Sequence, residues 1–232
     1  IFGWDCADVC YDNVDFTGWH TGYPDAEARI DLSTFREVPW DGDVPFFLAD
    51  FHDGQGKALE VCPRQLLKGV VKRAEAAGYS PRLGFEFEFF NFRETPTSLH
   101  EKGFANLDPI TPGMFGYSLL RASANQEYFS ALMEELGQFK VPIEGLHTET
   151  GPGVYEAAIL YSESVEAADR ATLFKAGTKE IASRFGIVPT FMAKLSADLP
   201  GCSGHLHQSL SDLEGSTNLF YNGDDEFKMA ET

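Results

Sequence analysis

The sequence GFEFEFF at residues 84–90 alternates aromatic and acidic side chains, and this pattern constrains the fold more than any other. Alternate side chains of a strand share a face, so we predict a strand with Glu86 and Glu88 on one face and phenylalanines on the other. Glutamates at this spacing lie roughly 6–7 Å apart at their backbones and repel each other unless a cation lies between them. A half-buried strand whose glutamates face water gives the same pattern, so the segment alone leaves both interpretations open.

The acidic composition excludes several classes of partner. The 232 residues include 36 Asp and Glu against 18 Lys and Arg, and the net charge of −18 would repel the phosphates of nucleic acids and anionic membranes. The 43% of hydrophobic residues is enough for one or two packed domains. The four cysteines lack a C-x-x-C pair and the density of a disulfide scaffold, which favours free thiols. Because we find no apolar run of 18 residues and no signal-peptide pattern, we expect no membrane span and a cytoplasmic location.

Periodicity predicts alternating strands and helices. Further predicted strands cover residues 44–51, 141–149, 154–160, 187–192 and 204–210, and predicted helices cover residues 63–78, 129–137 and 164–185. The turn at residues 53–56 predicts a hairpin between the strand at 44–51 and a partner near 58–61. Ser164 is a candidate helix cap, and three prolines within residues 91–118 predict a long loop.

Four of the predicted strands carry residue types that bind hard metal ions. These residues are Glu86, Glu88, Glu144, Glu149, Glu156, His205 and His207. Oxygen donors with one imidazole suit Mg²⁺ or Mn²⁺ better than zinc, although an isolated H-x-H pair is also typical of surface or core histidines. We find no Walker A loop, no G-x-G-x-x-G fingerprint and no G-x-S-x-G elbow, so any nucleotide is held in another way.

Four motifs, in order and at matching spacing, resemble those of the glutamine synthetase family. They are EFEFF at 86–90, EGLHTE at 144–149 followed by Glu156, TFMAK at 190–194 and GCSGHLHQSL at 201–210. The resemblance extends over nearly the whole chain and corresponds to about the first half of a family member. The chain has no initiator Met and no closing signal, so we expect a fragment. The resemblance implies an ATP-dependent ligase that joins the side-chain carboxylate of glutamate to ammonia or an amine through a γ-glutamyl phosphate.

The resemblance also implies the metal ligands. Glu88, Glu149 and Glu156 correspond to ligands of one Mg²⁺ or Mn²⁺ ion. Glu86 and His205 correspond to ligands of a second ion, whose remaining ligand comes from the C-terminal half of family members.

Six further positions correspond to substrate-contacting or catalytic residues of the family. Glu144 and Ser209 would contact ATP, Gly201 would contact the substrate glutamate, His207 would lie beside the transferred phosphate, and Asp5 and Tyr117 would lie near the incoming amine.

The chain departs from the family pattern where the amine is chosen. FGWD at residues 2–5 stands where ammonia-using members have an Asp-Gly-Ser loop, GYS at 116–118 replaces a motif around a tyrosine, and Ala193 replaces a proline. These departures favour an amine larger than ammonia. Two other readings stay open: a catalytically inactive relative with a structural or binding role, and a metal-dependent hydrolase built on the same carboxylates.

The resemblance implies an α+β fold in two parts and a shared active site. A small β-grasp domain would occupy residues 1–82, and residues 83–232 would form part of a catalytic domain with a curved antiparallel sheet. Family members form stacked rings in which neighbouring subunits share each site, so we expect a homo-oligomer.

Overall fold

The computed structural model describes residues 5, 7–11, 14–15 and 17–230. It divides the chain into two compact units, which we describe separately. The first contains Ile1–Phe35 and Phe47–Gly69, and the second contains Arg36–Phe46 and Val70–Thr232. No helix among the described residues is both long and apolar enough to cross a membrane.

A two-stranded sheet of β1 (Glu27–Val38) and β2 (Val44–His52) supplies most of the regular structure of the first unit. The predicted strand at 44–51 is confirmed, but its predicted partner near 58–61 is wrong. That segment forms only an isolated bridge between His52 and Ala58, because the chain turns into a helix at Pro63. The partner is β1, which reaches β2 through the short 3-10 helix η1 (Pro39–Asp41).

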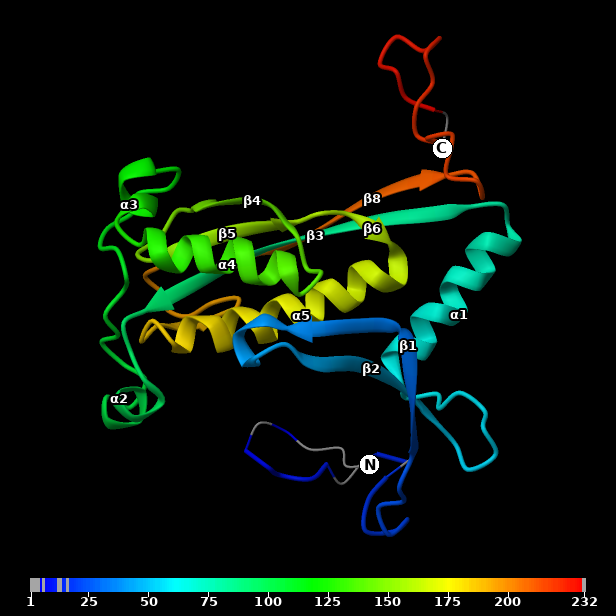
Figure 1. Ribbon diagram of the computed structural model, residues 1–232, viewed down its shortest axis with the longest axis horizontal. Coiled ribbons are helices and arrows are strands. Elements are labelled where there is room, and N and C mark those ends of the chain that lie inside the picture. The colour runs from blue at the N-terminus through cyan, green and yellow to red at the C-terminus, as the bar shows by residue number, and fades with distance from the viewer. Residues whose placement is uncertain (1–4, 6, 12–13, 16, 231–232) are drawn as a thin grey trace. The chain divides into compact units, whose positions relative to one another are not determined.

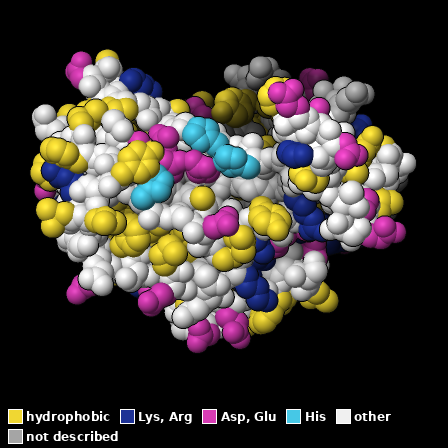
Figure 2. Space-filling model, turned by 90° about the horizontal axis from the view of Figure 1, so that it is seen from above, with side chains coloured by type: hydrophobic (Ala, Val, Ile, Leu, Met, Phe, Trp, Pro, Cys, Tyr) yellow, Lys and Arg dark blue, Asp and Glu magenta, His cyan; other side chains and the backbone are white. Residues whose placement is uncertain are grey.

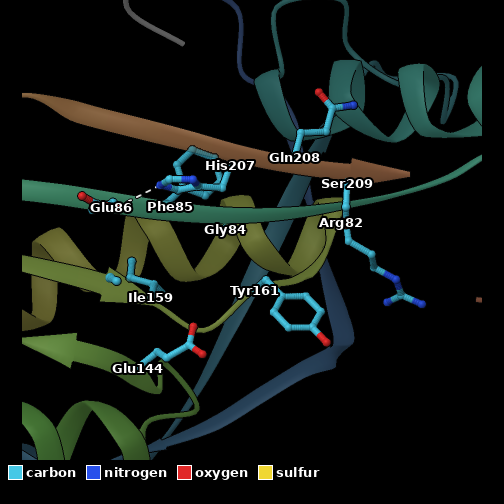
Figure 3. A pocket seen from close by; sticks show the side chains of 11 residues that line it. Arg82, Gly84, Phe85, Glu86, Glu144, Ile159, Tyr161, His207, Gln208 and Ser209 are labelled. Atoms are coloured by element: carbon cyan, nitrogen blue, oxygen red, sulfur yellow. Dashed lines mark hydrogen bonds and ion pairs between the residues drawn. The ribbon is translucent and has the colours of Figure 1, made fainter. Parts of the chain in front are cut away.

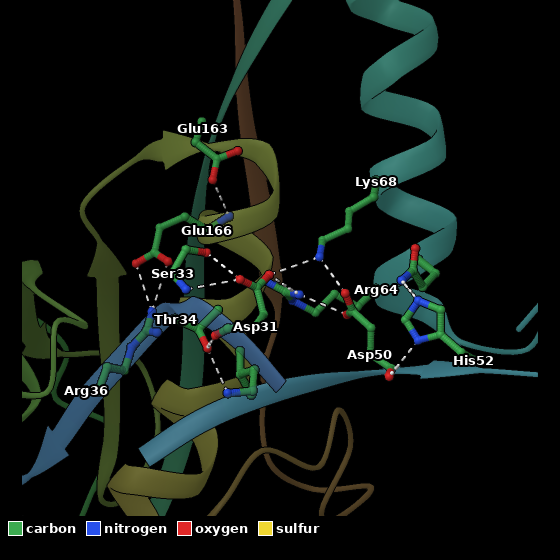
Figure 4. A network of polar contacts seen from close by, with 12 residues as sticks. Asp31, Ser33, Thr34, Arg36, Asp50, His52, Arg64, Lys68, Glu163 and Glu166 are labelled. Atoms are coloured by element: carbon green, nitrogen blue, oxygen red, sulfur yellow. Dashed lines mark hydrogen bonds and ion pairs between the residues drawn. The ribbon is translucent and has the colours of Figure 1, made fainter. Parts of the chain in front are cut away.

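An ion-pair network ties this sheet to α1 (Pro63–Ala76), which confirms the predicted helix. Arg64 Nη1 lies 2.9 Å from both Asp31 Oδ2 and Asp50 Oδ1. Lys68 Nζ lies 3.0 Å from Asp31 Oδ2 and 2.5 Å from Asp50 Oδ2. Figure 4 shows the charged groups of Arg64 and Lys68 between the two aspartates, so the buried Asp50 and the half-buried Asp31 each have two cationic partners.

The antiparallel sheet of the second unit is organised around β3 (Ser80–Phe92), which contains the alternating segment. Its antiparallel partners are β5 (Val154–Ile159), β6 (Ser162–Glu163), β7 (Val188–Thr190) and β8 (Gly204–Ser211), and β4 (Ile143–Thr148) pairs with β5. The predicted α+β class with an antiparallel sheet is thereby confirmed.

Two helices, α4 (Gln126–Gln138) and α5 (Ser164–Ser183), lie along one face of this sheet (Figure 1). The ring centroids of Phe87 and Phe89 each lie 5.9 Å from that of Phe174 on α5. Gly177 lets α5 pack closely, since a Cβ there would lie 2.8 Å from Leu136 Cδ2. The phenylalanines of the alternation therefore face the helices, and the glutamates face the opposite side.

Two local predictions are wrong in instructive ways. The N-cap of α5 is Glu163, whose carboxylate accepts hydrogen bonds from the backbone N–H groups of Val165 and Glu166, whereas the Ser164 hydroxyl donates to a carbonyl of β3. The predicted long loop contains α2 (Pro96–Glu101), which begins with a capping box, and it is followed by α3 (Leu119–Ser123). Polar caps override the loop pattern set by the prolines.

Candidate functional site

The register of the sheet brings the acidic residues together on the face away from the helices. Glu88 lies opposite Glu156 of β5, Glu86 lies opposite His205 of β8, and His147 of β4 lies opposite Glu156. Because residues opposite each other in antiparallel strands share a face, these side chains form one patch. Figure 2 shows histidine side chains gathered around this acidic surface.

The first ligand cluster contains Glu86, Glu156 and His205, each of which offers a ligand atom within 4.8 Å of the others. His205 Nδ1 lies 3.3 Å from Glu86 Oε1, and His207 Nε2 lies 2.8 Å from Glu86 Oε2. The structure thus places three predicted residues, Glu156, His205 and His207, around the carboxylate of a fourth, Glu86.

The second ligand cluster contains His147, Glu149 and Glu156 within the same 4.8 Å limit, so both clusters share Glu156. His147 was not among the predicted site residues. The available signal was its position two residues before Glu149 on the same strand, which puts both side chains on one face. Tyr117, predicted to lie near the amine, stacks on His147 with ring centroids 4.9 Å apart.

The electrostatics of these carboxylates are unfavourable without a cation. Burial raises the pKa of Glu156 to about 8, and the nearby charges of Glu86, Glu88 and Glu149 act in the same direction. The hydrogen bond that Glu156 makes with Glu86 lowers the pKa of Glu86, so these two side chains hold one proton between them. Like charges this close cannot both ionise unless a positive charge is added.

A divalent cation would supply a partner for a carboxylate oxygen of the site that has no hydrogen bond. Glu149 Oε2 is buried and has no hydrogen-bond partner, although Glu149 Oε1 accepts from the backbone N–H of Thr150 at 2.8 Å. Within the described ranges, no Lys or Arg forms an ion pair with Glu86, Glu149 or Glu156, whose ion-pair partners there are histidines. Hard oxygen ligands with an imidazole are a donor set for Mg²⁺ or Mn²⁺.

Glu88 belongs to neither three-residue cluster, although it lies on the same face. Its carboxylate accepts hydrogen bonds from the backbone N–H of Ser203 at 3.0 Å and from the Ser203 hydroxyl at 2.5 Å. Gly201, the predicted glutamate contact, lies in the same connection, where a Cβ would come within 2.6 Å of the Ala193 carbonyl oxygen. Only glycine fits this close approach of two backbones.

A cavity of about 400 Å³ extends along β3 from the Glu86 end of the patch. The predicted ATP contacts Glu144 and Ser209 both line it, as does His207. Figure 3 shows these residues together with Arg82 and Tyr161, neither of which was predicted from the sequence.

Asp5 belongs to the first unit, whereas the residues of the ligand clusters belong to the second. Its Oδ1 accepts hydrogen bonds from the backbone N–H groups of Ala7 and Val9 at 2.8 and 3.1 Å, which is a local turn contact. Its predicted catalytic role stays a prediction.

Known proteins share this sequence and fold. Residues 60–232 match the family model described as glutamine synthetase, catalytic domain. The chain is 56% identical over its whole length to type-1 glutamine synthetase 2 of Dictyostelium discoideum, of which it covers 44%. It is 37% identical to a glutamate–isopropylamine ligase of a Pseudomonas species, again over its whole length and over 50% of the relative.

Solved structures give the same result for the fold. A structure described as a GmaS/ADP complex superimposes with a TM-score of 0.77 at 28% identity, over 89% of this chain and 46% of the other. A second, described as a novel glutamine synthase homolog, gives a TM-score of 0.80 at 23% identity. The chain spans about half the length of the curated relatives it matches. From its motifs, its sheet register and these matches, the chain belongs to the glutamine synthetase family.

Proposed function

We propose that this protein acts in an ATP- and divalent-metal-dependent ligase that joins the side-chain carboxylate of glutamate to ammonia or an amine. The observation that carries the proposal is the convergence of Glu86, Glu149, Glu156 and His205 on one sheet face without Lys or Arg partners among the described residues. Relatives over the whole chain carry the names of a glutamine synthetase and of a glutamate–amine ligase, which supports this reaction class.

The chemistry explains why such a site is needed. A carboxylate is a poor electrophile, so an oxygen of the glutamate side chain first attacks the γ-phosphorus of ATP, and the bond to ADP breaks. The amine nitrogen then attacks the carbonyl carbon of the acyl phosphate, loses a proton and expels inorganic phosphate. The first step brings two anions together, and divalent cations held by the acidic residues of the site would offset the repulsion between them.

The residues of this chain would divide that work between cation binding and positioning. Glu88, Glu149 and Glu156 would hold one cation, and Glu86 and His205 would hold the other. In the structure, Ser203 orients the Glu88 carboxylate. His207 shares Glu86 with His205 and would donate to the transferred phosphate.

Tyr117 and Glu149 would receive the amine. Hydrogen bonding to the Glu149 carboxylate raises the pKa of Tyr117, so its hydroxyl keeps its proton at neutral pH. The backbone of Tyr117 has a left-handed φ of 54° and donates its N–H to the Thr148 carbonyl oxygen at 2.7 Å. These contacts fix the phenol ring beside the second cluster, where an ammonium group would find a carboxylate and an aromatic face.

An amine larger than ammonia is the finer version of this proposal. The departures around residues 116–118 and the name of the isopropylamine ligase relative both support it. A homo-oligomer of stacked rings, a β-grasp domain within residues 1–82 and a cytoplasmic location are further proposals from family membership. In such an assembly, Asp5 would act in the site of a neighbouring subunit.

The test measures ADP release by the purified protein as a function of glutamate, Mg²⁺ or Mn²⁺, and a panel of ammonium, isopropylamine, ethanolamine and aniline. We expect release that requires glutamate and metal, with a γ-glutamyl product visible by mass spectrometry. Much faster turnover with ammonium than with any amine would overturn the larger-amine proposal. Metal binding without turnover indicates an inactive relative, and amide or phosphate-ester hydrolysis without ATP indicates a hydrolase.

A further inference from the structure

A second large cavity lies at the C-terminal end of β3, away from the ligand clusters. It has a volume of about 660 Å³, and its walls come from Phe92 at the end of β3, from α2 and the turn after it, from the end of α5 and from β7. Figure 1 shows α2 beyond the end of the β3 arrow. Phe92 lies four residues past Glu88, about 13 Å away by the strand rise per residue. The described residues that line this cavity include none of the predicted site residues.

The lining of this cavity is largely apolar. It includes Phe92, Leu99, Phe104, Leu107, Ile187 and Leu195. Protein interiors are close-packed and leave few spaces larger than a water molecule, and water gains few hydrogen bonds in an apolar space. The volume is within the range of about 300–1,000 Å³ that is typical of pockets for small molecules. The cavity therefore suits an apolar occupant better than water.

The turn after α2 holds an aromatic ring at this cavity in an uncommon backbone conformation. Phe104 has a left-handed φ of 59°, which is rare for a bulky side chain. Its backbone N–H donates to the Leu99 carbonyl oxygen at 2.9 Å, and this bond fixes the turn. Phe104 is nevertheless 70% exposed. Because residues in this conformation cluster at ligand sites, the turn indicates that the ring is placed there to contact an occupant.

Of the described residues that line the cavity, two are charged, and they differ in their partners. The buried Glu94 carboxylate accepts hydrogen bonds from the Ser98 hydroxyl at 2.5 Å and from the backbone N–H of Asp108 at 3.0 Å. Lys102 forms an ion pair with the same carboxylate. In the part of the chain that the structure describes, no ion pair or hydrogen bond engages the exposed Lys179 ammonium. The cavity thus offers an apolar interior and one positive charge that lacks a partner.

These charges select the head group of an occupant. An amphipathic cation would be repelled by Lys179, and Glu94 already has its donors within the protein. A phosphate monoester carries a charge of about −1.5 to −2 at neutral pH, which one ammonium group does not balance. A carboxylate carries a single negative charge and matches one lysine.

We propose that this cavity binds a monocarboxylic acid with a flexible apolar chain, whose carboxylate pairs with Lys179 and whose chain packs against Phe92, Phe104 and Ile187. The cavity shares no described lining residue with the two ligand clusters. The proposal is therefore independent of the ligase reaction, and each can fail without the other.

The experiment compares ligands that differ in chain length and in head group. Isothermal titration measures the dissociation constants of decanoate, octanoate, decan-1-ol and decylamine for the purified protein. EDTA is present throughout, so that no metal ion holds a carboxylate at the glutamates of the other site. We expect decanoate to bind about tenfold more tightly than octanoate, since two further methylene groups are buried. It should bind about fivefold more tightly than decan-1-ol, which lacks the charge, and decylamine should bind most weakly.

Two substitutions test the two halves of the proposed site. Lys179→Met keeps the apolar stem without the charge, so it should weaken decanoate about fivefold and leave decan-1-ol within twofold. The matched control is Lys72→Met at an exposed lysine of α1, which should change neither. Val188→Phe enlarges a half-buried side chain that lines the cavity and should weaken decanoate more than tenfold. Its control is Val44→Phe on β2, where the valine is exposed.

Four results would overturn the proposal. A wild type that does not bind decanoate has no such site, because the cavity is then empty or covered by protein. Equal affinity for decanoate and decan-1-ol, or an unchanged decanoate affinity in Lys179→Met, would mean that Lys179 does not recognise a carboxylate. Decanoate binding to Val188→Phe with wild-type affinity would place the ligand elsewhere. Unfolding temperatures measured beside each titration distinguish a filled cavity from a lost fold, and the exposed Lys179→Met tests the site even where Val188→Phe does not fold.

Discussion

Two groups of buried or half-buried acids in this chain have opposite surroundings. In the first unit, Asp31 and Asp50 each contact both Arg64 and Lys68. In the second unit, the carboxylates of the two ligand clusters face one another and histidines, and Glu156 has its pKa raised to about 8, mainly by burial. In the first group, basic side chains of the protein balance the negative charges. In the second group, the negative charges would be balanced by an added cation.

The difference separates a structural role from a functional one. When a paired buried acid loses its partner, an uncompensated charge remains in the protein. Such a pair therefore stabilises the contact between the elements that carry it. Unpaired acids held close to one another cost stability and persist where they serve a ligand or a reaction. Four predictions test this contrast, from the largest expected effect to the smallest.

Glu156→Gln should lower metal-dependent turnover about a thousandfold or more, which corresponds to roughly 4 kcal/mol in the barrier. The reason is that Glu156 belongs to both ligand clusters, so its loss disturbs both cations. Steady-state ADP release at saturating glutamate and metal measures the effect. Glu134→Gln, on the exposed side of α4, is the matched control and should retain full activity. Activity of Glu156→Gln within tenfold of the wild type would refute the assignment.

Asp50→Ala should destabilise the fold by about 3 kcal/mol, because it removes a buried carboxylate that pairs with both Arg64 and Lys68. Urea unfolding at pH 7 measures the free energy of unfolding. Asp25→Ala, at an exposed aspartate of the same unit, should change it by less than about 0.5 kcal/mol. Equal effects of the two substitutions would mean that the network contributes nothing.

Mg²⁺ or Mn²⁺ at a hundred times its dissociation constant should stabilise the wild type by about 2.7 kcal/mol, since the cation binds the native state. Thermal unfolding with and without a chelator measures this increment. Asp50→Ala should keep the increment and Glu156→Gln should lose most of it. A loss of this metal-dependent stabilisation in Asp50→Ala would contradict the conclusion that the two acid groups have different roles.

The stability difference between the wild type and Asp50→Asn should shrink by up to about 1 kcal/mol between pH 6 and pH 3. Burial acts to raise the pKa of Asp50, but the hydrogen bonds and charges of Lys68 and Arg64 lower it below the pKa of an unfolded aspartate. Below about pH 4 the unfolded chain therefore binds more protons than the native chain, and stability falls with pH. Urea unfolding of both proteins across this range measures the effect, and a constant difference would contradict it.

The alternation in β3 could be interpreted correctly from the sequence because the face on which a strand residue lies depends only on its position along that strand. Glu86 and Glu88 face the site and Phe87 faces α5, as a period of two requires. The strand β1 was not predicted because most of its side chains are exposed, so its sequence shows no apolar stripe. Pairing with β2 stabilises β1 instead. That pairing is not visible in the sequence of β1.

The grouping of the ligands also depends on register between strands. Glu156 stands between β3 and β4 because β5 pairs with both, and this places it in two clusters at once. His147 lay inside a recognised motif but was not singled out, Arg82 carried no motif, and only the sheet shows what lies opposite them. By contrast, Thr95 followed by Pro96 is an N-cap residue before a proline in the first turn, and this pair could have predicted α2 from the sequence.

The shared position of Glu156 would link the two proposed cation sites thermodynamically. A cation entering one cluster would displace the proton held between Glu86 and Glu156, so the other cluster would then receive its cation without that deprotonation. Because linkage is reciprocal, each ion would change the affinity of the other by the same factor, and the metal content of the site would be a property of the pair.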